Sequence, residues 1–272
     1  MSARALQRVV VRMLHDASFV AAVYEDAEVA LQSEGLTSAE RVSLVRPDQR
    51  VWLLDPERPS RVFEAIRTEY PISCALAEVA SGGRGGMLRF FSSRPFHEAV
   101  QQRGTVALAF GAWLEAEARD GRLGRKPTAA TASLEAACAR VRRGPLAEVQ
   151  SGPLPPHLRV APWLERLSLP EGTLVLFEGV RATLAAGRPL GRCRLSGRGA
   201  ECVAVESSPA GGGLKVGLLP AGLAAMLEAA ALGIKSAALI ARVVSLGSPA
   251  DEAERVVKSA YHDGLLSSSP SA

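Results

Sequence analysis

The sequence predicts an α+β protein, and three observations support that class. Apolar residues recur at helical spacing through residues 1–120. The pattern then changes to a period of two, typical of strands, in segments between residues 173 and 219. Three short apolar segments, each broken by a glycine, close the chain between Leu218 and Leu266. We therefore expect an all-helical N-terminal domain followed by a winged helix-turn-helix-like C-terminal domain whose strands precede its helices.

Apolar stripes and capping residues mark the N-terminal helices. The segment ALQRVVVRMLHD places its large apolar side chains on one stripe, made by Leu6, Val9, Val10, Met13 and Leu14. Gly35 is suited to end the next helix. Thr37 or Ser38 is suited to cap the following one, with Glu40 in its first turn. A further helix is expected between Ser60, as its cap, and Pro71.

A change of composition predicts where the first domain ends. From Gly121 the chain is rich in Gly, Pro, Ala and Arg, and the run GPLPPH gives the strongest break, near residue 155. We expect a helical domain over residues 1–125 and a linker over 126–160 with one possible helix from Ser133 to Arg143. A second domain over 161–266 and a disordered tail over 267–272 follow.

The second domain is expected to begin with strands. Thr173–Val180 (TLVLFEGV) and the short run RCRL are strand-like, and AECVAVE alternates clearly. A flexible turn through Gly211, Gly212 and Gly213 then lets Leu214–Leu219 return as a hairpin partner. Three helices follow, and the third is expected to start near Pro249 with Ser248 as its N-cap.

The charge distribution argues against a nucleic-acid partner. The formal net charge is +4, but the basic excess lies in residues 81–160, which carry 12 basic and 6 acidic side chains. Nucleic-acid binders concentrate positive charge on the element that reads the groove. Here the first turn of the third C-terminal helix carries Asp251, Glu252 and Glu254, which would face phosphates. A DNA-binding regulator with a helical sensor domain remains the alternative interpretation.

The sequence contains no mark of export or membrane insertion. The N-terminus lacks a signal-peptide core, and the most apolar stretch, Ala221–Ile234, is short and contains Glu228. The cysteines are scattered, which favours buried thiols over a disulfide framework: Cys74, Cys138, Cys193 and Cys202. We expect a cytoplasmic protein with no membrane partner.

The residues that catalysis or metal binding requires do not occur together. The four histidines fall in separate segments and in no metal-ligand spacing: His15, His97, His157 and His262. The run SGGRGGML (Ser81–Leu88) lacks the Lys-Ser/Thr ending of a phosphate loop, so a mobile linker is expected there. We expect no catalytic residue, no metal site and no cofactor, which disfavours a stand-alone enzyme.

The hairpin strand Leu214–Leu219 is the candidate binding surface. If it lies at the edge of a sheet beside the helix Pro249–Asp263, an extended peptide can add to it as a further strand. Main-chain hydrogen bonds then give affinity, and pockets for alternate side chains give specificity. The other possibility is that the chain's own linker covers this edge.

Two parts of the chain resemble known families. Residues 173–266, with the pattern LKVGLLPAGLAAMLEAAALGIKSAALIARV and a final GLL, are similar to the recognition element of ribosomally synthesised, modified peptides (RiPPs). The prototype of that element is the small peptide chaperone of pyrroloquinoline quinone biosynthesis. The opening LQRVVVRMLHDASFVAAVYEDAEVALQSEGLTSAERVSLV resembles partner proteins of multinuclear non-heme iron oxidative enzymes. Two later runs, FFSSRPFHEAVQQRGTVALAFGAWL and LRVAPWLERLSLPEGTLVLF, fit the same pattern.

The resemblance implies a non-catalytic adaptor. Such a protein binds the leader of a precursor peptide and presents the peptide to a separate iron enzyme, with which it forms a heterodimer. On that basis the helical domain is expected to dock the enzyme, and the C-terminal domain to hold the leader. We expect peptide contacts from two segments, with the lysines pairing acidic leader residues: Leu214, Lys215, Val216 and Gly217 in the strand, and Val257, Lys258 and Tyr261 in the last helix.

Overall fold

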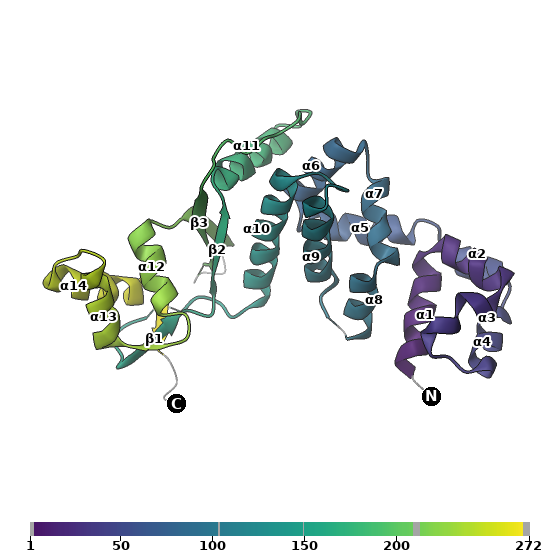
Figure 1. The fold of residues 1–272 in the computed structure, drawn as a ribbon, viewed down its shortest axis with the longest axis horizontal. Coiled ribbons are helices and arrows are strands. Elements are labelled where there is room, and N and C mark those ends of the chain that lie inside the picture. Colours follow the sequence, from purple (N-terminus) through teal and green to yellow (C-terminus); the bar gives the residue numbers. More distant parts are fainter. Residues whose placement is uncertain (1–2, 103, 149, 209–212, 269–272) are drawn as a thin grey trace. The chain divides into compact units, whose positions relative to one another are not determined.

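The protein is α+β, with most of its helices in the N-terminal part and two small antiparallel sheets in the C-terminal part (Figure 1). The structure, a computed structural model, describes residues 3–102, 104–148, 150–208 and 213–268. The N-terminal elements are α1 (Ala3–His15), α2 (Ala17–Glu25), α3 (Ala27–Ala30), η1 (Gln32–Glu34), α4 (Ser38–Val45), η2 (Gln49–Leu53), α5 (Arg58–Arg67), α6 (Pro71–Ser81), α7 (Gly85–Leu88), η3 (Arg89–Ser92), α8 (Arg94–Gln101), α9 (Val106–Arg119) and α10 (Lys126–Arg143).

The remaining elements mix strands and helices. They are β1 (His157–Val160), β2 (Leu164–Pro170), α11 (Thr173–Ala185), β3 (Ala200–Ser207), β4 (Leu214–Leu218), α12 (Ala221–Ala229), β5 (Ile234–Lys235), α13 (Ser236–Ser245), α14 (Ala250–His262) and β6 (Leu266–Ser268). The chain divides into two compact units, one of residues 1–136 and 180–194 and one of residues 137–179 and 195–272. No helix in the described ranges is long and apolar enough to cross a membrane.

The first four helices enclose a small apolar core. Val9 and Met13 of α1 are buried against Phe19, Val20 and Val23 of α2, as the predicted stripe requires. Asp16 separates the two helices because its carboxylate accepts the N–H of Phe19 at 3.0 Å and caps α2. Thr37 and Glu40 form a complete capping box at the start of α4, which confirms the cap predicted there.

An aromatic cluster fills the core between α5 and α9. Phe90 lies at its centre, with ring centroids 5.2 Å from Phe110 and 5.5 Å from Trp113. Tyr70 packs edge-on against Phe110. Its ring reaches α9 only because residue 111 is glycine: a Cβ there would lie 2.4 Å from the Tyr70 oxygen. The helix that was expected to end at Pro71 ends earlier: α5 ends at Arg67, and Pro71 instead begins α6.

A buried carboxylate joins α10 to the start of α6. Glu135 is 2% exposed, and its two oxygens accept the N–H groups of Ile72 and Ser73, each at 2.9 Å. It also accepts the Ser73 hydroxyl. These amides are among those that a helix N-terminus leaves without intrahelical partners. The helix expected from Ser133 is therefore present, but it starts earlier, at Lys126, and is part of the packed interior.

The strands predicted around the hairpin are confirmed, whereas Thr173–Val180 is not a strand. That segment begins α11, and its buried residues Leu174, Phe177 and Val180 recur every third position, which is helical spacing. The helix starts there because the Glu201 carboxylate accepts the N–H groups of Gly172 and Leu174 at 2.9 and 2.7 Å. The run RCRL forms no regular element either.

The second sheet uses segments that were expected to be linker and tail. β1 is its central strand, pairing with β5 on one side and with β6 on the other. Ser267 and Ser268 thus belong to a strand, and the rest of the predicted disordered tail lies outside the described residues. Trp163 lies between β1 and β2, and its indole N–H donates to the Gly264 carbonyl at 2.8 Å, shortly before β6.

Candidate functional site

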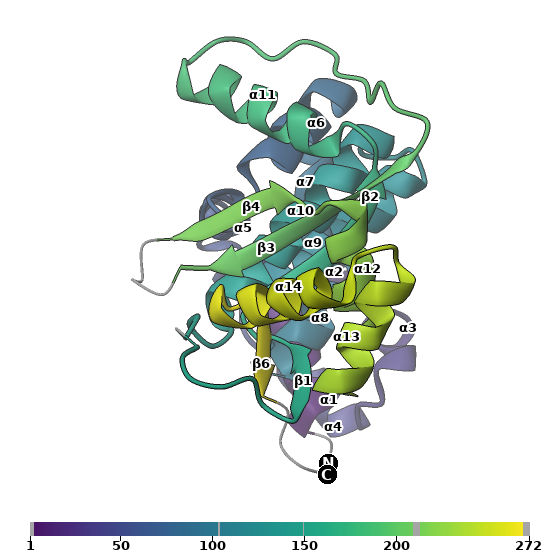
Figure 2. The same cartoon turned by 90° about the vertical axis from the view of Figure 1, so that its left-hand side faces the viewer.

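β4 is the edge strand of the sheet β2-β3-β4, as predicted (Figure 2). At one end of the β3–β4 pair the Leu219 N–H donates to the Cys202 carbonyl at 2.8 Å, and at the other the Ser208 N–H donates to the Gly213 carbonyl at 3.0 Å. Hydrogen-bonded pairs alternate along an antiparallel ladder, so residues 213, 215, 217 and 219 direct their main-chain groups to β3. Residues 214, 216 and 218 direct theirs away from the sheet.

Three consecutive outward positions therefore form an open edge, which we define as Leu214, Val216 and Leu218. No strand in the described part of the chain pairs with this side of β4. Leu214 and Val216 are half-buried, and Leu218 is 56% exposed. Their side chains lie on one face of the sheet, because residues two apart on a strand point to the same side. Val216 is opposite Val205 on β3, and Leu218 is opposite Val203. The edge thus offers both main-chain groups and apolar side-chain surface to an extended segment.

The predicted contacts in the last helix are placed differently from the expectation. Val257 is fully buried and Tyr261 is 6% exposed, and both belong to the C-terminal core with Leu227, Leu239 and Leu266. The helix α14 packs chiefly against α13 and β6. These two side chains support the core beneath the helix, and they do not present apolar surface to a peptide. The periodicity of the helix identified its apolar face correctly but could not tell which neighbour covers that face.

The two predicted cationic contacts are accessible but already paired. Lys215 Nζ lies 3.3 Å from a carboxylate oxygen of Glu206, the residue opposite it on β3. Lys258 Nζ lies 2.7 Å from Glu254, one turn earlier on α14. Gly217, between the outward positions Val216 and Leu218, bonds towards β3 and leaves open space where a Cβ would be. Of the seven predicted residues, only Leu214 and Val216 belong to the open edge.

The charges on α14 do not suit a DNA backbone. Asp251 is 81% exposed at the first turn, and Arg255 lies 3.3 Å from its carboxylate. Lys258 is neutralised by Glu254 in the same way. A helix that entered the major groove by its N-terminal part would bring these carboxylates to the phosphates first. Pro249, not Ser248, is the N-cap of this helix, and no side chain caps it.

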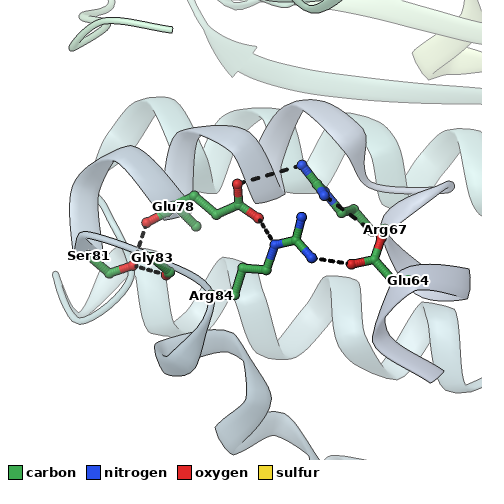
Figure 3. Close-up of polar contacts among 7 residues, drawn as sticks. Glu64, Arg67, Glu78, Ser81, Gly83 and Arg84 are labelled. Atoms are coloured by element: carbon green, nitrogen blue, oxygen red, sulfur yellow. Dashed lines mark hydrogen bonds and ion pairs between the residues drawn. The ribbon is translucent and has the colours of Figure 1, made fainter. Parts of the chain in front are cut away.

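The glycine-rich run Ser81–Leu88 is a fixed connection between helices. Figure 3 shows Arg84 lying between Glu64 and Glu78, with Arg67 reaching the same Glu78 carboxylate at 3.6 Å. The Ser81 hydroxyl donates to the Gly83 carbonyl at 2.9 Å. The only helix that starts here, α7, is a single turn. The cation of this run is engaged by two carboxylates, so the run carries no phosphate site.

The described residues contain no group of three or more side chains placed to hold a metal ion. All four cysteines lie in the described ranges, and none forms a disulfide. His97 is buried in the N-terminal unit, and both its ring nitrogens lack hydrogen-bond partners there. Burial, together with the nearby Arg12 guanidinium, lowers the pKa of His97 to about 4. This histidine stays neutral near pH 7 and is packed in the core.

Sequence reasoning included Leu218 in the edge strand but did not name it among the peptide contacts. The signal was present in the alternation of Leu214, Val216 and Leu218, but the strand was expected to continue to Leu219 and its outward positions were not separated from its inward ones. Comparisons with protein-family models, with curated proteins and with solved structures give no match to this chain. The geometry of the β4 edge and the sequence resemblance are therefore the two indications of function.

Proposed function

We propose that the protein is a non-catalytic adaptor that binds the leader of a ribosomally synthesised precursor peptide by strand addition to β4. The observation that carries this proposal is the open edge, where three outward-facing main-chain positions lie beside apolar side chains. Strand addition needs such an edge and little else, because main-chain hydrogen bonds supply most of the affinity. The adaptor then presents the peptide to a multinuclear non-heme iron oxidative enzyme for modification.

The order of elements supports the finer fold assignment that goes with this proposal. A three-stranded antiparallel sheet, β2-β3-β4, with α11 between its first two strands, is followed by the three helices α12, α13 and α14. β5 lies between the first two of these helices, and β6 follows the last. We interpret this unit as winged-helix-like, with its strands first.

A single substitution tests the edge. Val216→Pro removes one outward N–H without removing a hydrogen bond to β3, and proline is tolerated at an outward position of an edge strand. Affinity for the leader should fall about fivefold, because a net main-chain hydrogen bond contributes about 1 kcal/mol. Val216→Thr, which keeps the N–H, is the matched control. Unchanged affinity in a folded Val216→Pro variant would overturn strand addition at β4.

Co-purification tests the adaptor role. The chain should be expressed together with the genes that adjoin its own, purified by a tag on this chain, and examined by metal analysis and mass spectrometry. The proposal predicts a complex that contains an iron enzyme and a short peptide. Recovery of this chain alone, with duplex DNA retained at moderate salt, would favour the transcriptional regulator instead.

A further inference from the structure

Between α11 and β3 the chain carries a concentration of positive charge that the proposed site does not use. Residues 179–199, which we call the arginine arm, contain five arginines, and neither Asp nor Glu occurs between Glu178 and Glu201. The five are Arg181, Arg188, Arg192, Arg194 and Arg198, and all are exposed. Over residues 161–272 as a whole the charge is nearly balanced, with 11 basic and 10 acidic residues, so this local excess of positive charge is not visible in the total.

None of the five arginine side chains makes an ion pair or a hydrogen bond with another described residue. Most arginines in the helices α1–α9, in contrast, form ion pairs. Arg94 pairs with Glu98, for example, and Arg119 pairs with Glu115. Local neutralisation is therefore the rule in these helices, and the arm departs from it. Arginines that repel one another on a single segment cost stability, and a partner with carboxylates removes that cost.

The acidic residues nearest to the arm are committed elsewhere. The Glu201 carboxylate accepts the N–H groups of Gly172 and Leu174 at the start of α11. The Glu171 carboxylate accepts the N–H of Gly199 at 3.1 Å, and its side chain leaves no room for a Cβ at residue 197. The two carboxylates therefore hold the base of the arm in place, where β2 ends and β3 begins, and leave the arginines unpaired.

We infer that the arginine arm binds an acidic peptide segment, and the carboxylates of the proposed leader are the ligands that suit it. This inference rests on the proposed function, because it assigns the cations that the peptide's carboxylates would meet. Lys215 and Lys258, the expected partners, are already paired with Glu206 and Glu254. Guanidinium groups match carboxylates in bidentate geometry, so arginine is the suitable residue for this task.

The composition of the arm favours an acidic peptide over nucleic acid. Residues 179–199 contain no aromatic side chain on which a base could stack. Beyond Ala185 the arm has no helix or strand that could enter a groove. Carboxylates on an extended peptide need neither stacking nor a groove, and they need only exposed guanidinium groups.

Peptide binding by the full-length protein tests the inference. The probes are two fluorescent peptides with the same alternating Val-Thr segment, one followed by a run of glutamates and the other by glutamines. Anisotropy at low salt measures both affinities, since screening weakens exposed pairs at high salt. The test variant is R188Q/R192Q/R194Q. The matched control R94Q/R119Q/R255Q changes the net charge equally, at exposed arginines that are ion-paired.

The unmodified protein should prefer the glutamate peptide about tenfold, since each exposed pair contributes a fraction of 1 kcal/mol. The arm variant should lose this preference, while it binds the glutamine peptide unchanged and the control variant keeps the preference. The inference is overturned if the unmodified protein shows no preference, if the arm variant keeps it, or if the control loses it equally. It is also overturned if single-stranded nucleic acid binds the arm more tightly than the glutamate peptide.

The same titrations separate this inference from the proposed function. Binding of the glutamine peptide reports the β4 edge, and V216P should weaken it. The difference between the two peptides reports the arm alone. Loss of the preference in the arm variant, with V216P having no effect on either peptide, would support the arm and overturn strand addition.

Discussion

The helices α1–α9 and the segment from residue 179 to residue 218 differ in whether their polar groups have partners within the protein. In the helices, buried carboxylates such as Asp16 cap neighbouring helices, and most arginines lie in ion pairs. In the later segment, the side chains of five exposed arginines and the outward main-chain groups at three positions of β4 have no partner among the described residues. Polar groups that are satisfied internally hold the fold together. Groups that are left unsatisfied at the surface are available to a partner.

The strongest test of this difference is the removal of an internally satisfied group. Glu135→Ala leaves the N–H groups of Ile72 and Ser73 buried without an acceptor and opens a cavity. The free energy of unfolding should fall by about 4 kcal/mol, because each buried unsatisfied donor costs about 1–3 kcal/mol. Urea denaturation measures this value. Glu135→Gln, which keeps one acceptor oxygen, should lose less, and equal losses would contradict the capping role.

A second test uses the pH dependence of stability. Burial, then Arg12, lowers the pKa of His97 to about 4, so the unfolded chain binds a proton that the folded chain does not between about pH 6.5 and pH 4. His97 therefore contributes full stability above about pH 6.5, and this stability is lost as the pH falls towards 4. The loss should approach about 3 kcal/mol.

The titratable groups near His97 also contribute to the pH dependence of stability in this window. Burial also lowers the pKa of His15, so His15 acts in the same direction. Burial would raise the pKa of Asp16, but hydrogen bonds from Ser18 and Phe19 outweigh it and lower that pKa, so Asp16 contributes below the window. Thermal denaturation across the range, with His97→Phe as control, measures the effect. An identical slope in the control would show that His97 is not the source.

Substitution at the open edge should change stability less than Glu135→Ala does, and it should affect peptide binding more than it affects stability. Val216→Pro should change the free energy of unfolding by less than about 1 kcal/mol, because it removes no bond to β3. Lys215→Pro, one residue earlier, removes a donor that bonds to β3 and should destabilise the protein clearly more. Urea denaturation of both variants distinguishes the outward from the inward positions. Equal destabilisation would contradict the alternation inferred for β4.

The smallest effect is expected at the paired lysines. Lys215→Gln with Lys258→Gln removes two exposed ion pairs, and each such pair contributes about 0–1 kcal/mol. The preference for the glutamate peptide over the glutamine peptide should change by less than about twofold. A loss as large as that of the arm variant would return the role of cationic contacts to the lysines.

Local patterns in the sequence predicted the parts of the fold that local chemistry decides. Thr37 and Glu40 cap a helix whatever its surroundings, and the alternation from Leu214 to Leu218 specifies a strand. The start of α11 was not predictable in this way, because its cap comes from Glu201 on a strand that follows much later in the chain. The same holds for β1, whose partners are β5 and β6.

The candidate site was predictable only in part, for the same reason. The position of β4 at a sheet edge follows from hairpin order, and it was expected. The burial of Val257 and Tyr261 depends on how α14 packs against α13, which periodicity does not specify. The arginine arm was missed because charge was averaged over residues 161–272, whereas the unpaired state of its arginines is a property of the folded chain.

Amide hydrogen exchange, resolved by residue, tests the central claim most directly. The protein is measured with and without the glutamate peptide. Strand addition predicts that exchange slows at Leu214, Val216 and Leu218, while Lys215 and Gly217, whose N–H groups already bond to β3, change little. Slowed exchange confined to α14, or none along β4 while the peptide is bound, would contradict binding at this edge.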